Sequence, residues 1–79
     1  MKRLIERGNA YRFLEDDEGR MFLTILLGGI ASELVSIPLD DVEAGFIRDN
    51  PDRAEDFVRQ VALNEDAYRP RAIQPVIWD

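Results

Sequence analysis

The sequence predicts an α+β domain: an antiparallel meander of three or four strands, two helices packed on one face of the sheet, and an extended C-terminal tail. Strand-like apolar segments separated by glycine-containing turns fill the first half of the chain. After residue 39 the apolar spacing changes to three and four residues, which is typical of amphipathic helices. Proline then interrupts the last segment. At 79 residues the chain has room for a single domain, residues 1–79.

Three segments have the apolar pattern of β-strands, at about residues 10–15, 20–27 and 33–37. The acidic loop between the first two contains Gly19, which can adopt the positive φ that a tight hairpin requires. Short loops between consecutive strands favour antiparallel pairing. An additional edge strand over Lys2 to Arg7, joined through a turn at Gly8-Asn9, is left open by the sequence.

The first helix is expected at about residues 40–48. Asp40 followed three residues later by Glu43 forms the pattern of a capping box, in which each side chain bonds the backbone N–H of the other residue. The apolar residues at helical spacing in this segment are Leu39, Val42 and Phe46.

The second helix is expected at about residues 51–63. Asn50 is a favourable N-cap, and Pro51 would take the first helical position, where its missing N–H has no cost. The residues expected on its buried face are Ala54, Phe57, Val58, Val61 and Ala62.

The central strand is apolar on both faces. Its odd-numbered residues from Met21 to Leu27 line one face, whereas Phe22, Thr24 and Leu26 line the other. Two short helices can cover one face of such a sheet but not both. Leaving Phe22 and Leu26 in water would forgo about 1.5–3 kcal/mol each. The second face therefore needs cover from the tail, from the N-terminal segment or from another chain.

The tail, residues 72–79, is expected to be extended, because Pro75 is incompatible with a helix interior. It carries large apolar side chains where chain termini are usually polar. Two interpretations stay open: the tail packs on its own domain as an edge strand, or it docks on a partner chain. Since the tail is short and Pro75 interrupts its hydrogen bonding, we expect a homodimer. The candidate interaction residues are Phe22, Leu26, Ile73, Val76, Ile77 and Trp78.

Acidic clusters are interpreted as structural rather than as metal sites. Residues 15–18 (EDDE) are contiguous and flanked by strands, unlike a calcium loop with its alternating ligands and flanking helices. Asp40, Asp41 and Glu43 lie where the helix dipole favours negative charge. We therefore expect no metal site.

Catalysis is not expected either. The chain has no histidine and no cysteine, so Ser32, Ser36 and Thr24 have no evident activating base. Gly28-Gly29 lacks the Gly-Lys-Ser/Thr ending of a phosphate loop and is interpreted as a tight turn. No catalytic residue and no cofactor are predicted.

The charge balance bears on partners and location. A net charge of −6, from 16 acidic and 10 basic residues, disfavours binding to nucleic acid. The apolar runs are too short to span a membrane, and the first seven residues have no apolar segment of the signal-peptide type. A cytoplasmic protein that binds neither membrane nor nucleic acid is expected.

Three functional hypotheses follow. The leading one is a small, acidic, non-catalytic interaction module that self-associates through its apolar sheet face, its C-terminal tail or both, with a further protein partner left open. The alternative is an acidic inhibitor or immunity-type protein that blocks a basic site on another protein. The third, a small or metal-dependent enzyme, is disfavoured by the missing histidine and cysteine. An acidic face would favour the inhibitor, and an apolar patch of several hundred Å² the self-associating module.

Overall fold

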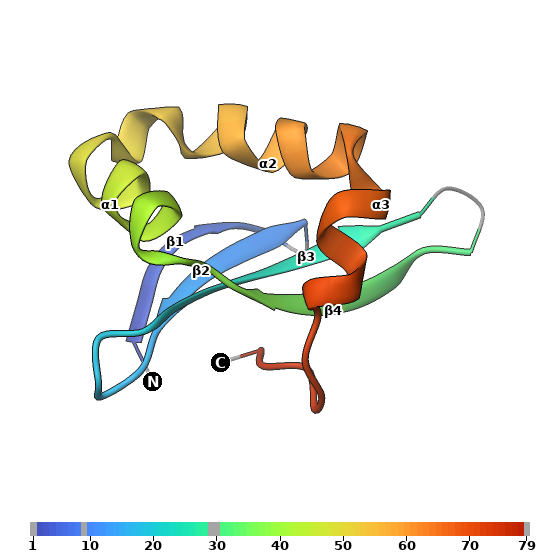
Figure 1. Cartoon of the computed structure of the whole chain (residues 1–79), viewed down its shortest axis with the longest axis horizontal. Helices are drawn as coiled ribbons and strands as arrows, with labels where there is room; N and C mark the ends of the chain where they lie inside the picture. The colour runs from blue at the N-terminus through green and yellow to red at the C-terminus, as the bar shows by residue number, and fades with distance from the viewer. Residues whose placement is uncertain (1, 9, 29–30, 79) are drawn as a thin grey trace.

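A computed structural model describes residues 2–8, 10–28 and 31–78 of the chain. It confirms the α+β class, with a four-stranded antiparallel meander in the order β1-β2-β3-β4 followed by helices (Figure 1). The strands are β1 (Lys2–Arg7), β2 (Tyr11–Glu15), β3 (Met21–Leu27) and β4 (Glu33–Pro38). The additional edge strand is therefore present. The sequence also predicts a turn at Gly8-Asn9 and another at Gly28-Gly29. Asn9 of the first turn, and Gly29 and Ile30 of the second, lie outside the described residues.

The strand register gives the sheet two different faces. Phe13, Leu23 and Ile37 are paired across β2, β3 and β4 on the face toward the helices, and all three are fully buried. One residue further along each strand the side chains point the other way. The β2–β3 hairpin closes as expected, with Gly19 at a φ of 81° and the Asp16 N–H bonded to the Arg20 carbonyl at 3.0 Å.

The helical elements cover one face of the sheet (Figure 1). They are α1 (Asp41–Asp49), the 3₁₀ turn η1 (Pro51–Arg53), α2 (Ala54–Leu63), the short α3 (Glu65–Tyr68) and the 3₁₀ turn η2 (Arg69–Arg71). The last two descend beside β4 and lead the C-terminal segment to the opposite side of the sheet (Figure 1). The sequence did not predict α3 or η2.

The capping box of α1 is confirmed. The Glu43 N–H donates to the Asp40 carboxylate at 2.8 Å, and the Asp40 N–H donates to the Glu43 carboxylate at 2.9 Å. The expected apolar stripe is wrong at Val42, which is 82% exposed, because α1 is rotated so that Ala44 and Ile47 face the sheet instead.

The predicted role of Asn50 is also wrong. Its side-chain amide donates to the carbonyl of Phe46 at 3.1 Å, and its backbone N–H donates to the same carbonyl at 2.9 Å. Asn50 therefore ends α1 rather than capping the next helix, and α2 begins three residues later than expected, after η1. The predicted buried face of α2 is confirmed at Ala54, Phe57 and Val61, whereas Ala62 is exposed.

Candidate functional site

The C-terminal segment crosses the second face of the sheet. The Ile73 N–H donates to the Ser36 carbonyl at 2.8 Å, forming a single antiparallel bridge beside β4. The chain then passes through the cis Gln74–Pro75 bond and brings Ile77 over the middle of β3 and β4. In this structure the tail packs on its own domain, through one bridge and not a full edge strand.

A closed ring of hydrogen bonds fixes the tail at Ile77. Thr24 and Ser36 are directly opposed on β3 and β4, and both are fully buried. The Ile77 N–H donates to Ser36 Oγ at 2.8 Å, Ser36 Oγ and Thr24 Oγ1 are 2.7 Å apart, and Thr24 Oγ1 donates to the Ile77 carbonyl at 2.5 Å. Each hydroxyl has one proton and two acceptor positions. With the Thr24 proton on the carbonyl, Ser36 donates to Thr24, so that the ring satisfies both backbone groups of Ile77.

Trp78 continues this contact toward β2. Its ring lies over the Arg12 guanidinium, 4.0 Å from the ring centroid, as in a cation–π pair. Arg12 Nε also forms an ion pair with Glu6 of β1 at 3.2 Å. The end of the tail is thus connected through Arg12 to the edge strand β1.

The six predicted interaction residues have different environments. Phe22 is 7% exposed and is covered by its own chain, so the argument for a second subunit that started from this ring loses its basis. Leu26, on the same face, is 46% exposed. The four tail residues Ile73, Val76, Ile77 and Trp78 are half-buried. Sequence reasoning did not link Thr24 and Ser36 to the tail, although hydroxyl residues in apolar strands are a signal that a polar group approaches.

A second feature is an open groove of about 380 Å³ on the helical side, between α1 and α2. We call it the α1–α2 groove; its apolar lining residues are Val42, Phe46, Phe57 and Tyr68. Phe57 is anchored in the core, with its ring centroid 6.2 Å from Phe13 and 6.3 Å from Tyr68. Gln60 and Asp56 lie at the α2 wall.

Arg71 holds the walls of this groove in place. Its guanidinium donates to both carboxylate oxygens of Glu43, at 2.5 and 3.0 Å, and to the Pro38 carbonyl at 2.9 Å. It also lies over the Tyr68 ring, 5.4 Å from the centroid. The hydrogen bonds with Glu43 raise the pKa of Arg71 against the opposing effect of burial. Because Glu43 also closes the capping box, one carboxylate connects the start of α1 to the end of the helical region.

The net charge is concentrated on the helical side. We define the helical layer as residues 40–66, which comprise α1, η1, α2 and the start of α3 with their caps. This layer contains nine acidic residues and three arginines, a net charge of −6, whereas the rest of the chain contains seven acidic and seven basic residues. Arg69 and Arg71, which follow in the same helical region and pair with Glu65 and Glu43, reduce this to −4 over residues 40–71, so that most of the net charge lies on the helical side.

The acidic hairpin loop has a structural role. Asp16 accepts the N–H groups of Glu18 and Arg20 at 3.0 and 2.9 Å and pairs with Arg20 Nε at 2.7 Å. Although burial opposes ionisation of Asp16, these hydrogen bonds lower its pKa. Glu15 pairs with Arg48 of α1 at 2.8 Å. Within the described ranges, no group of three acidic side chains is arranged to hold a metal ion.

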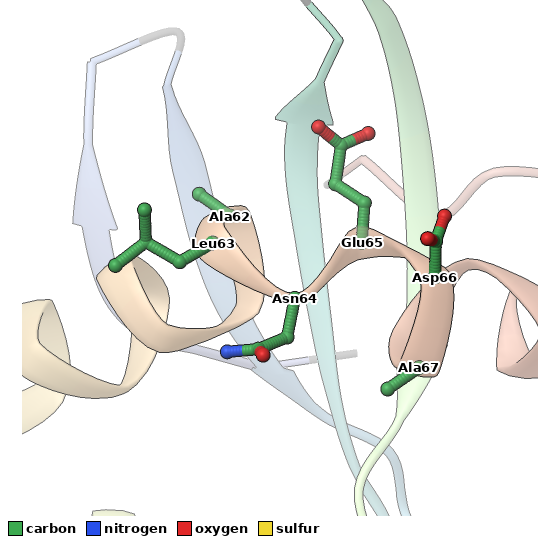
Figure 2. Close-up of a pocket in the computed structure, with 6 residues that line it drawn as sticks. All are labelled: Ala62, Leu63, Asn64, Glu65, Asp66 and Ala67. Atoms are coloured by element: carbon green, nitrogen blue, oxygen red, sulfur yellow. The ribbon is translucent and has the colours of Figure 1, made fainter.

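Another hollow, of about 360 Å³, lies at the bend between α2 and α3, where residues 62–67 line it. Figure 2 shows that its side chains point away from one another: Asn64 points to one side of the bend, whereas Glu65 points to the other. The Asn64 amide is bonded to the Gln60 carbonyl at 2.7 Å and ends α2. The hollow is a bend in the backbone without converging functional groups.

Comparisons with protein-family models, with curated proteins and with solved structures found no match to this chain. In the part of the chain that the structure describes, every helix is too short or too polar to cross a bilayer.

Proposed function

We propose that the chain is a non-catalytic, cytoplasmic interaction module that contacts a basic surface of a partner protein through its helical layer. The observation that carries this proposal is the location of the net charge, which is −6 over residues 40–66 and −4 when Arg69 and Arg71 of the same helical region are included. A surface of one sign attracts an oppositely charged partner over a distance and disfavours wrong partners. This distribution favours the inhibitor type of module, which blocks a basic site.

Three further observations support the proposal. The hydroxyls of Thr24 and Ser36 are buried and hydrogen-bonded to the tail, so they stabilise the fold and are not accessible to a substrate as nucleophiles. The large apolar side chains exposed among the described residues are Leu26, Val42 and Leu63, which lie apart on β3, α1 and α2. With no cysteine, the fold needs no oxidising compartment, which is compatible with the cytoplasm.

The test compares two variants with the same change in net charge. Glu55→Gln with Asp66→Asn neutralises two exposed acids of the helical layer, and Asp17→Asn with Glu18→Gln neutralises two exposed acids of the hairpin loop. Each immobilised protein captures partners from an extract of the source cells, and captured proteins are identified and quantified by mass spectrometry. We expect basic partners that are lost in the first variant and at raised salt, and retained in the second. Equal capture by both variants, or no specific partner, would contradict the proposal.

Self-association is a second candidate, supported by the exposure of Leu26 on the sheet face that the tail crosses at Thr24 and Ser36. An interface over this face would bury Leu26 in each subunit of a two-fold dimer. Sedimentation over a dilution series tests it: the wild type should dissociate on dilution, and Leu26→Lys should be monomeric throughout, with Leu63→Lys on the helical side as the control. A wild-type monomer at every concentration would exclude this candidate.

A further inference from the structure

We infer that the α1–α2 groove is the docking site for a basic amphipathic segment of the partner, which inserts apolar side chains between Val42 and Tyr68 while its lysines or arginines face the helical layer. This inference rests on the proposed function and assigns its contact site. A protein segment fits this site because four apolar side chains line the groove, and the helical layer in which it lies has a net charge of −6.

The groove can accept large apolar side chains. Its volume of about 380 Å³ lies within the range of roughly 300–1,000 Å³ that is typical of ligand pockets. Three aromatic rings line it: Phe46 and Tyr68, which are partly buried, and Phe57, which is 9% exposed. Val42 stands at its α1 wall with 82% of its surface exposed, so that a docked segment would cover an apolar side chain that the fold leaves in water.

The groove is also held in its open shape before any partner binds. Glu43 is fixed by the Asp40 N–H at 2.9 Å and by Arg71 at 2.5 Å, which holds α1 against the end of the helical region. On the opposite wall, Phe57 packs between Phe13 and Tyr68. A preformed site avoids the entropy cost of ordering its walls on binding.

The net charge of the helical layer favours a basic segment. Asp56 at the α2 wall has surface ion pairs with Arg53 and Arg59, at 3.4 and 3.6 Å. Exposed pairs of this kind contribute little and can exchange for a partner's lysine or arginine. Among the described residues that line the groove, Glu43 and Asp56 are acidic and Arg53 is basic, while Arg71 binds Glu43 from beside the groove. The helical layer that forms the walls has nine acids and three arginines. An acidic segment would meet repulsion from this layer.

The test uses synthetic helical peptides as probes. The first has leucines on one face and lysines on the other; the second has glutamates in place of the lysines; the third has serines in place of the leucines. We expect the leucine–lysine peptide alone to bind tightly, and to shift the amide NMR signals of Val42, Phe46, Gln60 and Tyr68. Equal binding of the glutamate or serine peptide, or shifts spread evenly over the chain, would overturn the inference.

Matched variants separate the groove from the general charge of the layer. Val42→Lys and Leu63→Lys each place a lysine at a highly exposed apolar position of the helical layer, but only the first lies in the groove. Val42→Lys should weaken binding of the leucine–lysine peptide by about tenfold or more, as loss of a central contact does, and Leu63→Lys by less than about threefold. Both positions are exposed, so an unfolding melt should show that each variant is folded.

The outcomes also separate this inference from the function on which it rests. If the two lysine variants weaken binding equally, while Glu55→Gln with Asp66→Asn still reduces partner capture, the helical layer is the contact and the groove is not. If neither the lysine variants nor the charge-neutralised variant changes binding, both the docking site and the proposed function are wrong.

Discussion

Replacing Thr24 by valine tests whether the hydroxyl ring holds the tail. Valine has nearly the shape of threonine but has no hydroxyl, so Thr24→Val removes the bond to the Ile77 carbonyl and the bond to Ser36. A net contribution of about 0.5–1.5 kcal/mol per hydrogen bond gives a loss of about 1–3 kcal/mol. A chain of 79 residues has a total stability of about 4–12 kcal/mol, so this one substitution should remove a substantial fraction of it.

The measurement is urea unfolding followed by two signals. The single tryptophan, Trp78, lies on Arg12 in the tail, so its fluorescence reports the tail directly. Circular dichroism reports the sheet and helices. Thr24→Val should lose stability and shift the Trp78 emission toward that of a solvated indole before the fold melts, whereas Thr24→Ser, which keeps the hydroxyl, should retain the native emission.

A double-mutant cycle with a chain that ends at Ala72 completes this test. If Thr24 acts through the tail, most of the cost of Thr24→Val should disappear once residues 73–79 are removed. The reasoning would be refuted if the substitution costs the same in the full and the shortened chain, that is, if the coupling energy is below about 0.5 kcal/mol.

Three further predictions concern the rest of the fold. Phe57→Ala should destabilise by about 3–5 kcal/mol in a urea melt because the ring is in the core, while Val42→Ala, at an exposed position, should stay within about 0.5 kcal/mol of wild type. Asp40→Ala removes the capping box and should cost about 0.5–2 kcal/mol, measured in the same way. The pKa of Asp16 is lowered from 3.8 in the folded state, so its stabilisation is present above that value and is lost as the pH falls through the lower folded value. Asp16→Asn should therefore destabilise at neutral pH and converge on wild type in acid, and a similar effect of Asp17→Asn would contradict this.

Local signals explain why much of the fold could be predicted. The turn at Gly19 and the capping box of Asp40 and Glu43 each involve residues within a few positions of one another. The buried face of α2 at Phe57 and Val61 follows from the helical period alone. These features need no knowledge of the distant chain.

Competition between local partners explains the errors. Asn50 has the right chemistry to cap the following helix, but its amide reaches back to the Phe46 carbonyl instead. The preceding helix leaves carbonyls without partners at its end, just as the following one leaves N–H groups at its start. Periodicity alone also misplaced Val42, because the angle at which α1 leaves β4 decides which residues face the sheet.

The site depends on pairings that local patterns do not contain. Ser36 and Ile77 are 41 residues apart, and Arg12 meets Trp78 only because the tail crosses the second sheet face. The sequence did predict that this face needs cover and that the tail was one candidate for it. It did not indicate how the tail is held there: the buried Ser36 hydroxyl accepts the Ile77 N–H, and the buried Thr24 hydroxyl donates to the Ile77 carbonyl.

The tail and the helical layer together account for the two-sided apolar character of β3. One face of the strand packs under α1 and α2, and the other is covered around Thr24 by the tail, so the sheet uses both faces within one chain. A domain that closes its sheet in this way has its helices free to carry charge, because their outward surface is not needed for folding. Part of the negative charge on residues 40–66 serves the fold, because Asp40 and Glu43 form the capping box of α1 and Glu43 binds Arg71. We propose that the rest of this charge attracts a basic partner, with the apolar α1–α2 groove of the same layer as its proposed binding site.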